Sequence, residues 1–288
     1  MPQVLKEWDI DRIASLLRAA GEVALQYYEA PPTELKEDRT VVTAADKAVE
    51  KLLGGAFDAP AHDVWMIGEE TVSSRSEDYI RSALQSDNCF VVDPIDGTAP
   101  YTAKLPVWGI SIGFMKRGVL AEGAVYLPAL DECLATCGGR LLQCKLNREN
   151  RWRDFTPTAV KLSPAGHIAI GQMPAHKFVF DCTNQLFAWS SVVGSVCWLL
   201  RGRVMAYLGD FKLWDVGGAL PLLRAAGFGV TLLGAGKTLS LDLNDGGFIL
   251  EPHSEKRWKV TAPALIARES AVADYILSHI HDTGSATS

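Results

Sequence analysis

The alternation of hydrophobic and polar residues predicts a long helix near the start of the chain. Asp9 can cap this helix, and a pair of prolines at positions 31 and 32 would end it. A second helix is expected from about residue 43 to residue 57. Between residues 8 and 29 the apolar side chains recur at the spacing of one buried helix face: Ile10, Ile13, Leu16, Leu17, Ala20, Val23, Ala24 and Tyr27.

Short apolar runs predict strands in the rest of the first half. Residues 64–67 and 90–92 indicate buried strands, while residues 109–115 and 119–126 flank a charged turn and predict a hairpin. The string GISIG around Ser111 imitates the nucleophile elbow of serine hydrolases, which requires a strand, a sharp turn and then a helix. Because the alternation continues through the serine into the hairpin, a serine hydrolase is disfavoured.

In the second half, predicted strands alternate with predicted helices. The strands are expected at 167–171, 204–208 and 229–233, and the helices near 187–201, at 214–226 and at 263–281. The polar stretch 148–158 predicts a boundary, so residues 1–150 and 151–288 are expected to form two halves. Early helices, a central antiparallel run and an alternating second half together indicate an α/β protein of layered sheets and helices.

Composition narrows the possible partners. The 288 residues carry a net charge of −6, whereas non-specific nucleic-acid binding needs a basic face. The N-terminus has charges where a secretory signal would be apolar, and the longest apolar run ends early at Arg201. We therefore expect a cytoplasmic protein that binds neither membrane nor nucleic acid.

Two aspartates stand where an apolar strand ends, in the string FVVDPIDGT. Like charges as close as Asp93 and Asp96 repel each other, and burial makes both resist ionisation. Pro94 restricts the backbone and gives the loop a defined shape. A divalent cation between the carboxylates would turn repulsion into attraction, and Mg²⁺ takes carboxylates together with water and substrate phosphate. The pair is therefore interpreted as part of a metal site for phosphoryl chemistry.

Three further acidic sites also end apolar elements, and each has an ordinary structural alternative. Asp46 can be the third residue of a capping box. Glu69 and Glu70 can be a solvated strand end, and Asp215 can be a carboxylate favoured at a helix start. Thr98, directly after a glycine that permits close backbone approach, could orient an attacking water.

Taken together, these motifs resemble those of the inositol monophosphatase family. Its members are metal-dependent, lithium-sensitive phosphatases. The matching strings are IGEE at 67–70, DPIDGT at 93–98 and WDVGGA at 214–219, with VVTAAD at 41–46 upstream. The resemblance covers about residues 5–275. It implies an alternating αβαβα sandwich, usually a homodimer, that hydrolyses a small phosphorylated metabolite with metal-activated water.

The resemblance also implies a ligand set. Glu69, Asp93 and the Ile95 carbonyl would hold a first Mg²⁺, and Asp93 would share a second with Asp96 and Asp215. Two or three ions are implied, with Mn²⁺ as a substitute and Li⁺ and Ca²⁺ as inhibitors.

The remaining implied roles concern water and substrate. Asp46, Thr98 and Glu69 are the expected catalytic residues, and Glu70 would support the metal site or reach a third ion through water. The implied substrate contacts are Gly97, Thr98, Ala99, Gly194, Ser195 and Asp210.

The chain departs from the family pattern where the substrate would bind. Ala99, Pro100 and Tyr101 follow the DPIDGT string in place of the usual residues, and only Asp210 can replace a glutamate common before the Trp-Asp motif. Inositol phosphate is therefore not favoured over a sugar phosphate, histidinol phosphate or a 3′-phosphoadenosine nucleotide. A rival hypothesis keeps the fold and makes regulatory binding its main role, since fold alone does not establish function.

Overall fold

Within the described residues, most strands belong to one of two sheets. The computed structural model describes residues 4–29, 33–35, 41–149, 151–158, 160–234 and 236–283. The strand orders are β3-β4-β5-β6-β7-β8-β9 and β12-β10-β13-β15-β14. The larger sheet comprises β3 (Trp65–Gly68), β4 (Cys89–Asp96), β5 (Gly109–Lys116), β6 (Val119–Leu127), β7 (Glu132–Cys137), β8 (Arg140–Cys144) and β9 (Arg153–Asp154). The smaller comprises β10 (His167–Ile170), β12 (Gln185–Phe187), β13 (Ala206–Gly209), β14 (Gly229–Leu232) and β15 (Ala264–Ala267).

Two short antiparallel pairs and a set of helices complete the described structure. The pairs join β1 (Thr33–Leu35) to β2 (Val41–Thr43) and β11 (Phe178–Phe180) to β16 (Ile280–Asp282). The helices are α1 (Ile10–Tyr28), α2 (Ala44–Phe57), α3 (Glu77–Gln85), α4 (Thr98–Thr102), α5 (Gln172–Lys177), α6 (Val192–Leu200), α7 (Leu213–Gly217), α8 (Ala219–Ala225) and α9 (Ser270–Ser278).

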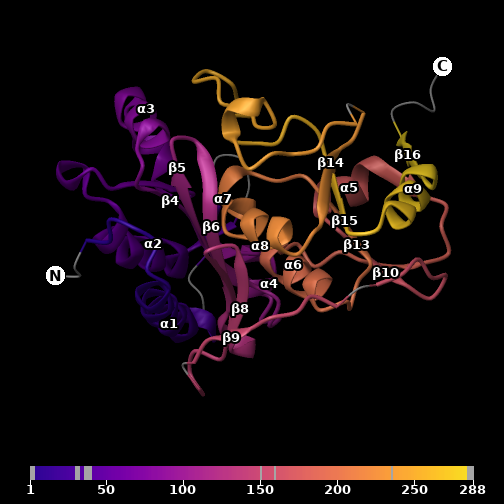
Figure 1. Ribbon diagram of the computed structural model, residues 1–288, viewed down its shortest axis with the longest axis horizontal. Helices are drawn as coiled ribbons and strands as arrows, with labels where there is room; N and C mark the ends of the chain where they lie inside the picture. The colour runs from indigo at the N-terminus through magenta and orange to yellow at the C-terminus, as the bar shows by residue number, and fades with distance from the viewer. Residues whose placement is uncertain are drawn as a thin grey trace.

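The elements stack in five alternating layers, which follow one another from left to right in Figure 1. Helices α1 and α2 cover one face of the larger sheet, α6 to α8 lie between the two sheets, and α5 and α9 cover the outer face of the smaller sheet. Buried apolar side chains form three clusters between these layers in the described chain. Their burial is the main stabilising contribution. The αβαβα architecture expected from the sequence is confirmed.

Local signals explain the two N-terminal helices. The Asp9 side chain accepts hydrogen bonds from the first backbone N–H groups of α1, as predicted. Thr43 and Asp46 form the capping box that begins α2. The proline pair at positions 31 and 32 lies outside the described residues.

The predicted C-terminal helix at 263–281 is confirmed only in its later part. Its first part is β15, which pairs with both β13 and β14, and α9 begins only at Ser270. The apolar run Ala264–Ala267 is fully enclosed between two strands, and so short a run does not distinguish a buried strand from a buried helix.

Two other predicted helices have different limits. The helix expected near 187–201 begins at Val192, because Ser191 caps it and β12 precedes it. The helix expected at 214–226 is interrupted at Gly218, which separates α7 from α8. The backbone of Gly218 lies so close to the larger sheet that a Cβ there would be 2.5 Å from the Ala124 carbonyl oxygen. The break therefore reflects close packing of this segment on the sheet.

The change from the larger to the smaller sheet does not fall at residue 150. Strand β9 lies beyond that position but pairs with β8, so it belongs to the larger sheet. The smaller sheet begins at His167. The division into residues 1–150 and 151–288 stays a prediction.

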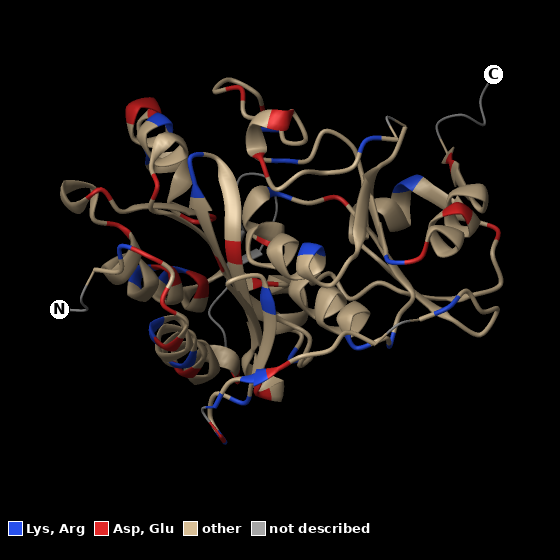
Figure 2. Ribbon diagram, in the orientation of Figure 1, with Lys and Arg blue, Asp and Glu red and all other residues tan. Residues whose placement is uncertain are grey.

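Charged residues are distributed as expected for such a layered protein. Lys and Arg alternate with Asp and Glu over the outer helices α1 to α3, whereas α6, in the enclosed middle layer, carries no charged residue (Figure 2). Among the described residues, no helix combines the length and apolarity needed to cross a membrane.

Candidate active site

Parallel pairing brings the first two acidic motifs together. Strands β3 and β4 are parallel neighbours, with Gly68 opposite Val92. The next residues along each strand are Glu69 and Asp93, and the Glu69 N–H donates to the Val92 carbonyl across 3.2 Å. Since the carboxyl ends of adjacent parallel strands share one edge, both acidic residues leave the sheet at the same place.

A β-bulge near the end of β4 contains Pro94 and Ile95, the two residues between Asp93 and Asp96. Asp93 pairs with Ser111 of β5 and Asp96 pairs with Gly109, so the register shifts between the two aspartates. Bulges of this kind re-aim side chains and are common beside active sites. Here the bulge takes Ile95 out of regular pairing, which makes its carbonyl available at the sheet edge.

The third acidic motif is supplied by the middle helical layer. Helix α7 packs against β4 and β5, and the Asp215 carboxylate accepts a 2.7 Å hydrogen bond from the Lys212 N–H. The structural alternative for Asp215, a carboxylate at a helix start, is therefore confirmed. Capping uses one carboxylate oxygen and does not exclude a second role.

These acidic residues line one open cleft of about 750 Å³. Of the residues implied by the family resemblance, those that line it are Glu69, Asp93, Ile95, Asp96, Gly97, Thr98, Ala99, Asp210 and Asp215. Sequence reasoning did not identify the rest of the lining, namely Gly171, Gln172, Met173, His176, Ser190, Val192, Tyr207 and Lys259.

Asp46 lies behind the cleft lining and in contact with it. One carboxylate oxygen serves the capping box, accepting from the Thr43 N–H at 2.8 Å. The other lies 3.4 Å from the Thr98 hydroxyl oxygen, which is also 3.3 Å from the Ile95 carbonyl oxygen. The capping role and the predicted pairing with Thr98 therefore coexist in one side chain.

Asp96 connects the cleft to the start of α6. Its carboxylate accepts from the Val192 N–H at 3.0 Å, from the Val193 N–H at 2.8 Å and from the Ser191 hydroxyl. A carboxylate at a helix N-terminus is favoured by the unpaired N–H groups and by the helix dipole. The sequence signal for this contact was the capping serine directly before an apolar run.

Burial and mutual repulsion disfavour ionisation of the clustered carboxyl groups. Burial, followed by repulsion from Glu69, Asp96 and Asp215, raises the pKa of Asp93 well above its ordinary value. Burial raises the pKa of Asp215 to about 8, with repulsion from Glu69 and Asp96 adding to it and the nearby Lys212 partly opposing it. Burial also raises the pKa of Asp96 to about 6, even though its three hydrogen bonds favour the charged form.

The donor set has the chemistry of a hard divalent cation site. Carboxylates of Glu69, Asp93, Asp96 and Asp215 and the carbonyl of Ile95 supply only oxygen, which Mg²⁺ and Ca²⁺ prefer. Over the described ranges, no three Asp, Glu, His or Cys side chains already lie at the spacing that encloses an ion. The carboxylates also repel one another, which adds to the raised pKa values of Asp93 and Asp215, and a cation between them would offset that repulsion.

Two implied substrate contacts lie elsewhere. Gly194 and Ser195 are buried within α6 and do not line the cleft, and the Ser195 hydroxyl donates to the Ser191 carbonyl at 2.7 Å. Ser190 and Val192 reach the cleft in their place. The helix start, with its cap at Ser191, turns the later residues of α6 inward.

The distal wall of the cleft comes from segments far apart in the sequence. Asp210, which follows β13, lies 3.6 Å from the Lys259 ammonium group. Helix α5 adds Gln172, Met173 and His176. Nothing in the local sequence of α5 or around Lys259 distinguishes these residues from ordinary surface positions.

Comparison with known proteins agrees with the geometry. Residues 8–271 match the model of the inositol monophosphatase family. The chain belongs to this family. Its resemblance to these phosphatases, first seen in the separated acidic motifs, is therefore confirmed over nearly the whole sequence, and the chain is a phosphatase of this family.

Relatives with different names match this chain at similar identity. The Nus factor SuhB of Pasteurella multocida is 28% identical over 73% of this chain and 79% of its own length. The histidinol-phosphatase of Chlorobaculum parvum is 24% identical over 76% of this chain and 83% of its own length. Human inositol monophosphatase 1 is 25% identical over 76% and 81%.

Solved structures of the family share the fold. A staphylococcal inositol monophosphatase in a LiCl-soaked inhibitory complex superposes with a TM-score of 0.72 at 18% identity, covering 94% of both chains. An IMPase/NADP phosphatase complexed with Mg²⁺ and phosphate gives 0.70 at 18% identity, covering 92% of both. At this identity the likeness concerns the fold alone.

Proposed function

We propose that this phosphatase hydrolyses a small phosphomonoester with Mg²⁺ and water as the nucleophile. The observation that carries the proposal is the meeting of Glu69, Asp93, Asp96 and Asp215 in one cleft with raised pKa values for three of them. Such a cleft repels a phosphate dianion unless cations are present, because the side chains at its base are acidic. That charge supports a metal-dependent reaction, because cations in the cleft would offset it.

The ligand assignment is part of the proposal. Glu69, Asp93 and the Ile95 carbonyl would hold one cation, and Asp93, Asp96 and Asp215 a second. When bound, Mg²⁺ would lower the pKa of water and stabilise negative charge on the phosphoryl group. Relatives crystallised with Mg²⁺ and with Li⁺ support the choice of metal and the expectation that Li⁺ inhibits. A third ion near Glu70, substitution by Mn²⁺ and inhibition by Ca²⁺ are further expectations.

Thr98 and Asp46 would orient the nucleophile. The Thr98 hydroxyl can donate to the Asp46 carboxylate, 3.4 Å away, and this leaves its lone pairs free to accept a hydrogen bond from water in the cleft. As the water attacks phosphorus, its proton would pass to the Thr98 hydroxyl oxygen while the Thr98 hydroxyl proton passes to Asp46 Oδ1. General base assistance of this kind contributes about 10²–10⁴-fold to a rate.

Backbone geometry next to Thr98 favours close approach of phosphate. Gly97 has φ of 84°, and a Cβ at this position would lie 2.8 Å from the Ser191 Cβ. Only glycine fits here without strain. We propose that Gly97, Thr98 and Ala99 contact the phosphoryl group and that Asp210, with Lys259 beside it, contacts the leaving group.

A substrate panel tests the proposal. Phosphate release would be measured with an inositol phosphate, a sugar phosphate, histidinol phosphate and a 3′-phosphoadenosine nucleotide, each with Mg²⁺ and with excess chelator. We expect release from at least one compound that chelator abolishes and Mg²⁺ restores. Release unaffected by chelator would refute the metal assignment.

The regulatory alternative would be favoured by a different outcome. Tight Mg²⁺ binding without release from any compound of the panel would indicate a binding role on the phosphatase fold. The homodimer and the cytoplasmic location stay predictions, to be checked by light scattering and by fractionation.

A further inference from the structure

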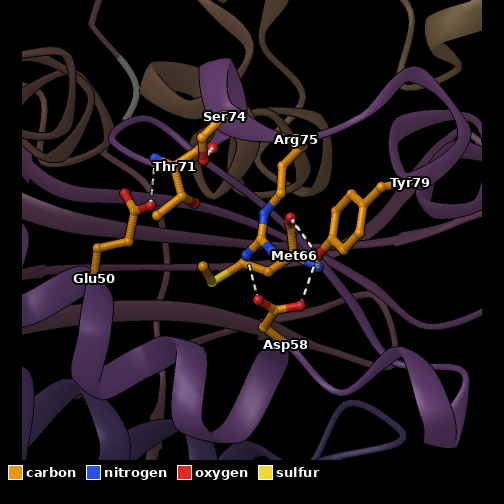
Figure 3. A network of polar contacts seen from close by, with 7 residues as sticks. All are labelled: Glu50, Asp58, Met66, Thr71, Ser74, Arg75 and Tyr79. Carbon is orange, nitrogen blue, oxygen red and sulfur yellow. Dashed lines mark hydrogen bonds and ion pairs between the residues drawn. The ribbon is translucent and has the colours of Figure 1, made fainter.

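A buried acidic residue outside the cleft, Glu50 of α2, faces the loop that carries Glu69. Its side chain is only 1% exposed. One carboxylate oxygen accepts from the Glu70 N–H at 2.8 Å, and the other accepts from the Thr71 N–H at 2.9 Å. Figure 3 shows Glu50 directed at this loop, with the bond to Thr71 drawn. Neither the proposed ligand set nor the family motifs use this carboxylate.

The end of β3 is shaped to receive the same carboxylate. A Cβ on Gly68 would lie 2.5 Å from Glu50 Oε1 and 2.6 Å from its Cδ. Glycine at this position therefore lets the carboxylate lie directly against the strand end. Glu50 thus contacts the backbone on both sides of Glu69, at Gly68 before it and at Glu70 and Thr71 after it.

We propose that Glu50 is a positioning residue that presents the Glu69 side chain to the cation site. By accepting two successive N–H groups, its carboxylate sets the direction in which the chain turns as it leaves β3. A metal ligand on a loop is useful only if its backbone is held, because misorientation raises the cost of bringing the ligand to the ion. This inference rests on the proposed metal-dependent function.

A second contact network on the same helix provides a matched control. Asp58, the C-cap of α2, forms an ion pair with Arg75 and accepts a 2.8 Å hydrogen bond from the Tyr79 hydroxyl. That hydroxyl also lies 3.1 Å from the backbone N–H and carbonyl of Met66 (Figure 3). This network ties α2 to α3 and to Met66 in the middle of β3, whereas Glu50 bonds to the two residues that follow Glu69.

The experiment compares Glu50→Gln with Asp58→Asn. Each replaces a carboxylate on α2 by an isosteric amide, so each should lower the unfolding temperature in EDTA. Mg²⁺ affinity, measured by calorimetric titration of the chelator-treated full chain, separates them. We expect Glu50→Gln to weaken Mg²⁺ binding by roughly 10–100-fold, the usual effect of losing a partner that orients a ligand. Asp58→Asn should bind Mg²⁺ within about twofold of the wild type, because its network leaves Glu69 in place.

Two further variants keep the test decisive. Gly68→Ala leaves every charge intact but displaces the Glu50 carboxylate, and it should weaken Mg²⁺ binding in the same direction. Glu50→Asp retains the charge with a shorter reach, and it should give an intermediate affinity. Raising Mg²⁺ should restore kcat in Glu50→Gln at a temperature well below its unfolding temperature in EDTA, where a variant damaged only in stability is already folded and needs no extra Mg²⁺.

The outcomes distinguish this inference from the proposed function. Normal Mg²⁺ binding by folded Glu50→Gln and by Gly68→Ala, beside a wild type that binds Mg²⁺, overturns the inference alone. Equal loss of affinity in Glu50→Gln and Asp58→Asn also overturns it, because general destabilisation would then explain both. A wild type that neither binds Mg²⁺ nor releases phosphate overturns the proposed function together with the inference.

Discussion

Asp215→Asn should make the metal-free protein more stable while weakening its stabilisation by Mg²⁺. In the folded state the Asp215 carboxyl is surrounded by other acidic groups, and its pKa is raised from 3.8 to about 8. The unfolded chain ionises this group near pH 4, so the folded state is penalised increasingly as the pH rises from 4 to 8. An amide carries no charge, and its oxygen can still accept the Lys212 N–H that caps α7.

The magnitude follows from the pKa difference. One pKa unit corresponds to about 1.4 kcal/mol, so at pH 7.5 the charge penalty has a ceiling of about 5 kcal/mol. Asp215 is partly exposed, and screening by water and relaxation of neighbouring acids reduce the gain to about 1–2 kcal/mol. For a protein of this size each kcal/mol corresponds to roughly 2–4 °C in unfolding temperature. The gain should shrink at pH 5, where the wild-type carboxyl is mostly protonated.

Thermal unfolding with EDTA and with saturating Mg²⁺ provides the assay. At a concentration of 100 Kd, Mg²⁺ should stabilise the wild type by about 2.7 kcal/mol. The variant should gain clearly less, because it lacks one of the ligands proposed for the second ion and keeps only the site proposed for the first. The order of stability should therefore reverse: Asp215→Asn unfolds at the higher temperature in EDTA, and the wild type does so in Mg²⁺. Phosphate release by the variant should fall to background.

Two results would refute this reasoning. A variant less stable than the wild type in EDTA at pH 7.5 would mean that the Asp215 charge does not destabilise the metal-free fold. A variant that gains as much stability from Mg²⁺ as the wild type would remove Asp215 from the ligand set.

Three further predictions test neighbouring residues. Asp96→Asn should also abolish phosphate release, but it should lower the unfolding temperature in EDTA. The amide N–H₂ group would face the Ser191 hydroxyl and the Val193 N–H, which are donors themselves, at a cost of about 1–3 kcal/mol. A variant more stable than the wild type would contradict those hydrogen bonds. Thr98→Ala should lower kcat on the order of 10²-fold in steady-state kinetics with Mg²⁺ affinity unchanged, whereas weakened Mg²⁺ binding would make Thr98 a ligand. Mg²⁺ affinity should rise with pH when it is titrated calorimetrically at pH 6, 7.5 and 9. Asp96, with a pKa of about 6, and Asp215, with a pKa of about 8, must lose their protons to bind the ion. An affinity that does not change with pH would contradict the raised pKa values.

Sequence reasoning succeeded where the signal was local. The helices α1 and α2 were predicted from apolar spacing and from caps at Asp9 and Thr43, and these contacts span only a few residues. Glu69 and Asp93 could be recognised because each directly follows an apolar strand. Their meeting in space required one non-local event, the parallel pairing of β3 with β4.

The sequence does not predict the structure where one local pattern is compatible with two different elements. The apolar run Ala264–Ala267 reads equally well as part of a buried helix, and only the strands on both sides of β15 decide the matter. Gly194 and Ser195 are expected among the substrate contacts by resemblance to the family, yet they lie in the first turn of α6, after the cap at Ser191, and are buried there.

The sequence by itself determined the family, the layered α/β class and the acidic residues available for a metal site, because these depend on residue type and short-range order. Tertiary structure alone decided what holds those residues. The hydrogen bonds of Asp96 to the start of α6 and of Glu50 to the loop after β3, and the pairing of Asp210 with Lys259, join segments 20 to 97 positions apart. Such contacts depend on how the layers pack, and no local pattern records that packing.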